Sequence, residues 1–218
     1  MITDANSVRI AYGKSGTGTP LILLHGCAED RHIFDRIVPG LSERFTVYAV
    51  DSRNHGESEK TSDYSYSAMA EDLMAFTDAL ALAPADVVGF SDGAIVALVA
   101  AMRRPVSFRR LALLSVNLKP SDLTPEARAF IQGLYDESKD PRLGNIFVEP
   151  DIELADASKV KLPALVVGAE NDVFRPELFR ELAAAMPNAE LMIMRGHDHL
   201  SYVVDKDILL PDLLRFFG

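Results

Sequence analysis

Short apolar runs recur along this chain, and most of them precede a longer segment whose apolar residues fall at helical spacing. The runs predict strands at 7–13, 21–26, 45–50, 85–90, 109–115, 163–169 and 189–194. The helical spacing predicts helices at 33–44, 67–82, 94–103, 176–186 and over the C-terminal segment that ends in LLRFFG. Alternating strands and helices of this kind predict an α/β fold, with a mostly parallel twisted sheet and helices on both faces.

One region interrupts this alternation, from about residue 118 to residue 161. It contains four prolines, many charged residues and no apolar run that reads as a strand. The pattern predicts one helix at 125–135, followed by irregular chain. Because this segment is too short to form a separate domain, we expect a single domain over residues 1–218 with an insertion at about 118–161.

A serine lies between two glycines where a predicted strand passes into a predicted helix. Gly89, Ser91 and Gly93 match the Gly-x-Ser-x-Gly pattern of a nucleophile elbow, a tight turn that exposes a strained serine. The start of the helix would also bring backbone N–H groups beside the hydroxyl. The alternative is an ordinary turn, but the strand–turn–helix context favours a nucleophile.

Several other polar residues follow predicted strands, where ligands collect in a parallel sheet. With the serine, they are His25, Asp51, Ser91, Asp172 and His199. A serine nucleophile needs a base, and the base needs an orienting acid. Asp172 and then His199 follow Ser91 in the chain order expected for a Ser-His-Asp triad. Asp172 as a turn or helix-capping residue is the alternative for the acid. His197 is the alternative for the base, and we favour His199.

Acyl transfer also needs donors aimed at the developing oxyanion. We expect the backbone N–H groups of Cys27 and Asp92 in that role, which leaves the Cys27 side chain incidental. Cys27 as an independent nucleophile is a weaker alternative, because no partner base is evident beside it. His25 and His55 each precede a glycine after a strand, where they can brace loops beneath the site. A metal bound by these histidines with Asp51 is a rival interpretation that no ligand spacing supports.

The net charge and the cysteine content exclude several classes of binding partner and of structural site. Twenty-two basic side chains against 32 acidic ones give a formal net charge of −10, which opposes binding to nucleic acid or to an anionic membrane. No signal-peptide pattern and no bilayer-spanning apolar run is present. The single cysteine, Cys27, excludes an intrachain disulfide and a cysteine-rich zinc site. We expect a cytoplasmic protein that acts on a small molecule.

Five segments together resemble the α/β-hydrolase superfamily, over nearly the whole chain. LILLHG resembles its oxyanion strand, VYAVDSRNHGESEK its D-x-R-x-x-G-x-S segment and VVGFSDGAIVAL its nucleophile elbow. LPALVVGAENDVFRPE resembles the acid segment, and HLSYVVDKD resembles the histidine segment of small esterase-like members. The resemblance implies Ser91 as nucleophile, His199 as base, Asp172 as acid, Cys27 and Asp92 as oxyanion donors, and no cofactor. In those members a tyrosine follows the histidine by three residues, as Tyr202 follows His199 here.

The chain departs from the family pattern at two places. His197 and Asp198 precede the histidine, where the family usually has small residues. The insertion that usually forms a helical cap is only about 40 residues long, so the pocket is expected to be open, shallow or completed by another subunit of a homo-oligomer. Four apolar residues of this cap are candidates for the pocket walls: Leu134, Tyr135, Ile146 and Phe147.

The leading functional hypothesis is a serine hydrolase that cleaves a small carboxylic ester through an acyl-enzyme. The same triad also serves carbon–carbon bond, lactone or thioester hydrolysis and perhalide formation, because the pocket decides the reaction. A slow-turnover sensor of a small molecule is the hypothesis from another class. A serine at position 91, where an aspartate would be required, argues against epoxide hydrolase or dehalogenase chemistry.

Overall fold

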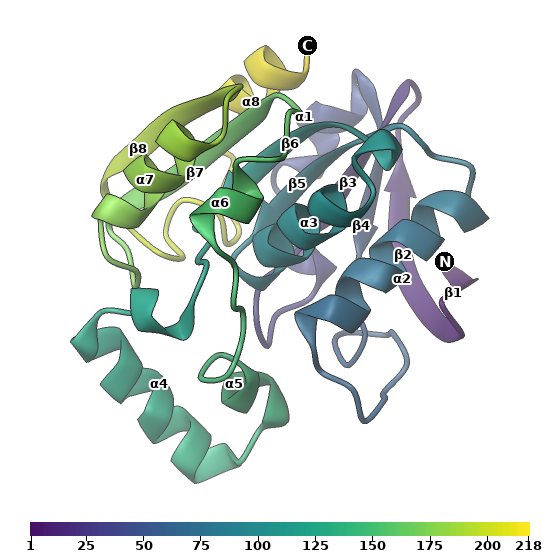
Figure 1. Ribbon diagram of the computed structural model, residues 1–218. Helices are drawn as coiled ribbons and strands as arrows, with labels where there is room; N and C mark the ends of the chain where they lie inside the picture. The colour runs from purple at the N-terminus through teal and green to yellow at the C-terminus, as the bar shows by residue number, and fades with distance from the viewer.

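The computed structural model describes residues 1–218 and has a twisted sheet of eight strands at its centre (Figure 1). The strands are β1 (Ile2–Ala5), β2 (Val8–Ser15), β3 (Thr19–Leu24), β4 (Phe45–Val50), β5 (Ala85–Phe90), β6 (Phe108–Leu114), β7 (Ala164–Asn171) and β8 (Ala189–Asp198). Their order across the sheet is β1-β2-β4-β3-β5-β6-β7-β8. The pairs β1–β2 and β2–β4 are antiparallel, and every other neighbouring pair is parallel. The predicted α/β fold is confirmed.

Helices cover both faces of this sheet. They are α1 (Val38–Ser42), α2 (Tyr66–Ala79), α3 (Asp92–Arg103), α4 (Pro125–Ser138), α5 (Pro141–Asn145), α6 (Leu154–Ala157), α7 (Glu177–Ala185) and α8 (Leu210–Phe217), with short 3-10 turns at Arg31–Phe34, Pro105–Ser107 and Pro120–Asp122. Helices α2, α3, α6 and α7 lie on one face, and α1 and α8 lie on the other (Figure 1). No helix is both long enough and apolar enough to cross a bilayer.

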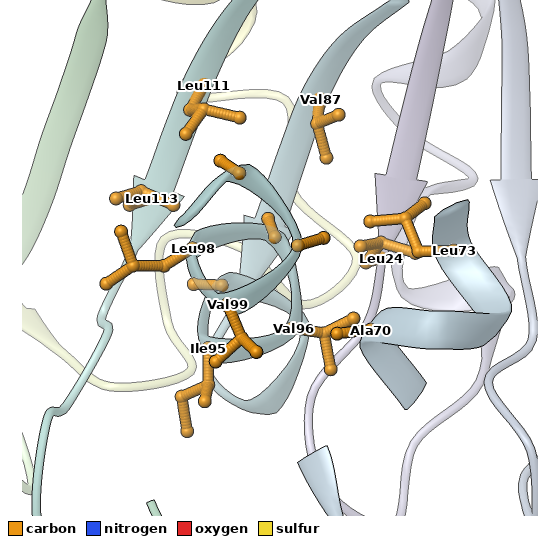
Figure 2. Close-up of a cluster of buried hydrophobic side chains, with 14 of the residues drawn as sticks. Leu24, Ala70, Leu73, Val87, Ile95, Val96, Leu98, Val99, Leu111 and Leu113 are labelled. Carbon is orange, nitrogen blue, oxygen red and sulfur yellow. The ribbon is translucent and has the colours of Figure 1, made fainter. Parts of the chain in front are cut away.

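The two faces of the sheet support two separate hydrophobic cores. Along β3, Ile22 and Leu24 join the larger cluster under α2 and α3, whereas Leu21 and Leu23 join the smaller cluster under α1 and α8. This alternation follows from the two-residue period of a strand. Figure 2 shows α3 laid over β5 and β6, with Leu98 beside Leu113. Burying each such leucine contributes about 1.5–3 kcal/mol, and α3 is buried from Gly93 to Ala101, so its position against the sheet is fixed.

Two N-terminal elements differ from the sequence prediction. The helix expected at 33–44 is a 3-10 turn at Arg31–Phe34 followed by the short α1. Pro39 has no N–H to donate to an earlier carbonyl, so α1 starts anew with this proline in its first turn. Strand β1 was not predicted. It pairs with β2 through a tight turn in which Asn6 and Ser7 both have positive φ, 51° and 61°.

The insertion between β6 and β7 contains α4, α5 and α6. The predicted helix at 125–135 is present as α4, but the chain that follows it is not wholly irregular, because Asp140 caps α5 by accepting a hydrogen bond from Arg142 N–H. Helix α4 has no buried residue. Figure 1 shows α4 and α5 projecting away from the sheet and its covering helices.

Candidate active site

Ser91 occupies the turn between β5 and α3 in a strained backbone conformation, with φ 51° and ψ −116°. Its own N–H donates to the carbonyl of Leu114 at 2.8 Å, which ties the turn to β6. Both flanking positions require glycine, because neither has room for a side chain. A Cβ on Gly89 would lie 2.3 Å from the carbonyl oxygen of Gly93, and one on Gly93 would lie 2.3 Å from that of Leu24. The turn therefore has the sharp geometry that the Gly-x-Ser-x-Gly pattern predicted.

The structure brings Ser91, His199 and Asp172 together in one hydrogen-bonded chain. His199 Nε2 lies 3.1 Å from Ser91 Oγ, and His199 Nδ1 lies 2.7 Å from Asp172 Oδ1. The imidazole is also fixed by aromatic neighbours, with ring centroids of Phe90 and Phe174 at 5.0 and 5.4 Å. Side-chain exposure falls to 13% at His199 and 1% at Asp172. An imidazole held between a hydroxyl and a carboxylate in this way can accept the hydroxyl proton.

Asp172 is held by more partners than the sequence indicated. Ser115 Oγ donates to its Oδ2, Ala169 N–H donates to the same oxygen at 3.1 Å, and Tyr202 Oη lies 2.6 Å from Ser115 Oγ. Burial alone would raise the pKa of Asp172, but the hydrogen bonds from His199, Ser115 and Ala169 outweigh it and hold the pKa below its ordinary value. The carboxylate is therefore ionised at neutral pH and can hold the His199 ring in place through its Nδ1.

Ser115 is a site residue that the sequence reasoning missed. It directly follows β6, so it satisfies the same rule that singled out the other polar residues after strands. Its hydrogen bond to the Asp172 carboxylate makes it part of the site, and its side chain is completely buried there. Tyr202 is completely buried as well, and it is the tyrosine that the family resemblance noted after His199.

The second histidine of the same loop has a different environment. His197 Nδ1 lies 3.2 Å from Ser201 Oγ, and His197 makes no hydrogen bond to Ser91 or Asp172. Ser201 Oγ also accepts from Asp198 N–H at 3.0 Å, so it belongs to a local turn. The geometry separates the two histidines, and only His199 is in reach of the serine.

The loop after β3 has one backbone donor free between two that are engaged. Gly26 N–H donates to Glu29 Oε2 at 3.0 Å, and Ala28 N–H donates to His55 Nε2 at 3.2 Å. The Cys27 N–H between them has no partner in the protein. Cys27 lines the same cavity as Ser91, so its free N–H is available as a donor to an oxyanion there.

Asp92, the residue after the serine, opens α3 with an N–H that has no intrahelical acceptor. Its carboxylate accepts from Tyr66 Oη at 2.8 Å. Burial raises the pKa of Asp92 to about 6, against the opposing effect of this hydrogen bond. Burial, with the charge of Asp92 added, raises the pKa of the Cys27 thiol well above its usual range. The thiol is thus protonated at neutral pH and is a poor nucleophile, which argues against an independent role for its sulfur.

His25 and His55 brace the loops around the site, as the sequence suggested. His25 accepts from Ser52 N–H at 3.1 Å and donates to the carbonyl of Gly26 at 2.7 Å. Burial lowers the pKa of both rings, to about 4 for His55, so each is neutral with one donor and one acceptor nitrogen. Asp51 instead accepts from Arg31 N–H at 2.9 Å. No three His, Cys, Asp or Glu side chains are arranged to hold a metal ion.

A cavity of about 240 Å³ adjoins the serine and histidine, and 11 of its 16 lining residues are hydrophobic. The lining residues are Cys27, Glu29, Tyr66, Phe90, Ser91, Asp92, Asn117, Leu123, Phe130, Ile131, Leu134, Ile146, Val173, Phe174, His199 and Leu200. The cavity opens to solvent beside α4, where Phe130 is 69% exposed. Of the three arrangements expected for a short cap, the open one is observed in the isolated chain.

Two of the four predicted pocket residues do not line this cavity. Leu134 and Ile146 do, whereas the prediction for Tyr135 and Phe147 is wrong. Their rings pack edge to face against each other, with centroids 6.3 Å apart. The ring of Tyr135 also lies beside Gly144 of α5, so it faces the rest of the cap and not the cavity.

Glu29 is a further cavity residue that the sequence reasoning missed. It lies in the loop and not directly at the end of a strand, so the rule for strand ends did not select it. Burial raises the pKa of its carboxyl to about 7, against the lowering effect of the hydrogen bond from Gly26 N–H. The cavity therefore contains two acidic groups, Glu29 and Asp92, that titrate near neutrality.

Comparison with known proteins gives a family match over residues 19–140, more than half of the chain, to a family described as "alpha/beta hydrolase fold". An sn-1-specific diacylglycerol lipase of Mus musculus is 34% identical over 118 residues, which span 52% of this chain and 38% of the lipase. A pimeloyl-[acyl-carrier protein] methyl ester esterase of Neisseria meningitidis is 38% identical over 91 residues, which span 42% of this chain and 34% of the esterase. The matched segments thus span little more than a third of either relative.

Among solved structures, a thermophilic esterase from Thermogutta terrifontis superposes with a TM-score of 0.84 at 19% sequence identity. The superposition covers 100% of this chain and 97% of the esterase. At this level of identity the likeness concerns the fold alone. It extends over the cap region as well as the sheet.

Proposed function

Because this chain belongs to the α/β-hydrolase family, we propose that it is a serine hydrolase that cleaves carboxylic esters through an acyl-enzyme. The observation that carries the proposal is the hydrogen-bonded chain from Ser91 through His199 to Asp172, with distances of 3.1 and 2.7 Å. The strained turn at Ser91 supports it, because such strain is characteristic of serine nucleophiles on this kind of turn.

In the first half-reaction, Ser91 Oγ attacks the ester carbonyl carbon while its proton passes to His199 Nε2. Asp172 accepts a hydrogen bond from His199 Nδ1–H and stabilises the imidazolium. The negative charge that develops on the carbonyl oxygen is met by the N–H groups of Cys27 and Asp92. The carbon–oxygen bond to the alcohol then breaks, and the alcohol leaves with the proton from His199.

In the second half-reaction, water attacks the acyl-Ser91 carbonyl and gives a proton to His199. Collapse of the tetrahedral intermediate releases the carboxylic acid, and the proton returns to Ser91 Oγ. The cycle consumes one ester and one water and needs no oxidant or reductant. All of its proton transfers use the one imidazole that the geometry joins to the serine.

The cavity and the relatives support an ester of a small acyl group as substrate. Both curated relatives reported above are named for action on ester-containing lipids or methyl esters. A cavity of about 240 Å³ with mostly hydrophobic walls suits a short to medium acyl chain. The open side at α4 gives a longer chain a route to solvent.

A panel of p-nitrophenyl esters of graded chain length tests this proposal, with Ser91→Ala as the control variant. We expect turnover of short and medium esters by the native protein, and a loss of about 10⁴-fold or more in Ser91→Ala. Circular dichroism and thermal unfolding would establish that the variant is folded. Equal turnover by native protein and folded Ser91→Ala would contradict the proposed nucleophile.

A further inference from the structure

Glu29 lies in the wall of the active-site cavity, close to the nucleophile. A Cβ placed on Gly26 would lie 2.7 Å from Glu29 Oε2 and 3.1 Å from Ser91 Cβ, so the carboxyl and the serine flank the same point. The carboxyl receives one hydrogen bond from the protein, from Gly26 N–H at 3.0 Å. No basic side chain forms an ion pair with it. The mechanism proposed above leaves this group unused.

The charges around Glu29 make the cavity negative. Its lining includes a second carboxyl, Asp92, and contains no lysine or arginine. Asp30 adds a negative charge from the same loop, and His199 is the only lining residue that can carry a positive one. Arg142 acts electrostatically on Cys27 from outside the cavity lining, but its guanidinium is paired with the carboxylate of Asp140.

The two carboxyls of the cavity lining, Asp92 and Glu29, differ in the hydrogen bonds that they accept from the protein. Asp92 accepts from Tyr66 Oη at 2.8 Å, so its position and part of its charge are fixed within the wall. Glu29 has only the backbone donor at its Oε2, and its Oε1 has no partner in the protein. A substrate group that enters the cavity therefore encounters the Glu29 charge with little compensation.

We propose that Glu29 makes the cavity selective for uncharged esters by repelling substrates with a carboxylate on the acyl group. The inference rests on the proposed esterase function and names its substrate class. A carboxylate would lose its hydration among apolar walls that offer it no cationic partner. It would also be repelled by the Glu29 carboxylate, and such repulsion is stronger at a half-buried group than between charges in bulk water. A neutral acyl chain of the same length meets neither obstacle.

The test compares ethyl hexanoate with monoethyl adipate, two esters of six-carbon acyl groups that differ in a terminal carboxylate. Ethanol release at pH 8 gives kcat/KM for both esters. We expect the native protein to favour ethyl hexanoate by about 100-fold, and Glu29→Gln to reduce this ratio about tenfold. The glutamine can still accept from Gly26 N–H, and the ratio cancels any general loss of activity that both esters share.

Glu43→Gln is the matched control, because it removes the same charge from an exposed carboxyl that makes no hydrogen bond and lies before β4, outside the cavity. We expect its ratio to equal that of the native protein. An unchanged ratio in Glu29→Gln, or an equal change in Glu43→Gln, would overturn the role of Glu29. The proposed esterase would still stand in that case, because ethyl hexanoate would still be hydrolysed. If the native protein hydrolysed neither of these two esters and no ester of the panel above, both the proposed esterase function and the role of Glu29 would be overturned.

The pH dependence of the native ratio gives a second test that needs no variant. The pKa of Glu29 is raised to about 7, so the carboxyl is largely protonated at pH 6 and largely ionised at pH 8. Monoethyl adipate remains an anion throughout, since an ordinary carboxyl has a pKa near 4.3. We expect the ratio to rise about tenfold from pH 6 to pH 8. A ratio that is flat or falls over this range would overturn the proposal.

The same profile in Glu29→Gln isolates the contribution of this carboxyl. The variant retains the other titratable groups that face Glu29, which are His199, Asp92 and Asp30. We expect most of the rise between pH 6 and pH 8 to disappear. A rise of equal size in the variant would assign the effect to those other groups and overturn the role of Glu29.

Discussion

The reacting groups and the cap that covers them are built in opposite ways. Ser91 is 8% exposed and the Asp172 side chain only 1% exposed, and both sit in loops that follow strands of the buried sheet. Helix α4 of the cap has no buried residue, and Phe130 in its middle is 69% exposed although it lines the cavity. The reacting groups are therefore held on all sides by the body of the protein, whereas helix α4 is held from one side only.

This difference separates the chemistry of the site from the choice of substrate. Proton transfer between a serine, a histidine and an aspartate requires positions held within tenths of an ångström. Those positions come from the two cores and from the hydrogen bonds around Asp172. The acyl group meets the cap, where apolar side chains face solvent and can adapt. Changes in the body are therefore expected to affect kcat, and changes in the cap to affect KM.

The largest expected effect distinguishes the two histidines of one loop. His199→Ala removes the base in reach of Ser91 and is expected to lower kcat/KM for p-nitrophenyl esters about 10⁴-fold. His197→Ala removes a ring that bonds only Ser201, and its activity is expected to stay within about threefold of native. Steady-state kinetics on the two folded variants give the comparison.

The same two histidine variants can also contradict the proposed mechanism. If His197→Ala were inactive and His199→Ala active, the base would be misassigned and the hydrogen bonds at 3.1 and 2.7 Å would have no role in the reaction. Exogenous imidazole supplies a further control. Partial rescue of His199→Ala by imidazole is expected, since the deleted group acts as a base and the turn that holds Ser91 does not depend on it.

An intermediate effect is expected at Ser115, which no step of the reaction uses directly. Ser115→Ala removes a hydrogen bond to the Asp172 carboxylate, an interaction worth about 1.5–3 kcal/mol when one partner is charged. The bonds from His199 and Ala169 N–H remain. We expect kcat to fall about tenfold, and the pKa of Asp172 to rise because a group that lowers it is lost.

The kinetics of Ser115→Ala distinguish positioning from simple loss of stability. A positioning role predicts a lower kcat at a nearly unchanged KM, together with a shift of the acidic limb of the pH–kcat profile. Ser115→Thr keeps the hydroxyl and is expected to recover part of kcat. Full activity in folded Ser115→Ala would show that Asp172 needs no support from β6.

The smallest effect is expected in the cap. Phe130→Ala removes an apolar wall that is already half open to solvent, and we expect KM for medium-chain esters to rise about two- to fivefold with kcat nearly unchanged. Val148→Ala is the matched control, because Val148 is 70% exposed in the same insertion but does not line the cavity. A large loss of kcat in Phe130→Ala would mean that the cap also positions the reacting groups.

Much of the fold could be predicted because its strands are apolar on both faces. β4 and β5 match their predicted bounds residue for residue. Strand β1 escaped prediction because it is short and largely exposed, and because its turn uses Asn6 and Ser7 where glycine would give the stronger indication. The helix expected at 33–44 failed because periodicity alone did not account for the break at Pro39.

The site was predictable to the extent that chain order and strand ends determine it. Ser91, Asp172 and His199 meet because each follows a strand of one parallel sheet. Ser115 follows the same rule and was overlooked. The cap could not be predicted in detail, because α4 has no buried residue and its sequence pattern therefore does not show which side packs against the protein. Which of Leu134 and Tyr135 faces the cavity depends on how α4 is rotated, and that rotation is set by residues distant in sequence.

The central claim is that Ser91 is an activated nucleophile, and covalent labelling tests it most directly. A fluorophosphonate probe followed by peptide mass mapping should modify Ser91 alone in native protein. Labelling should be at least about 100-fold slower in folded His199→Ala and close to native in His197→Ala. Modification of another residue, or no modification of Ser91 in folded protein, would contradict the account.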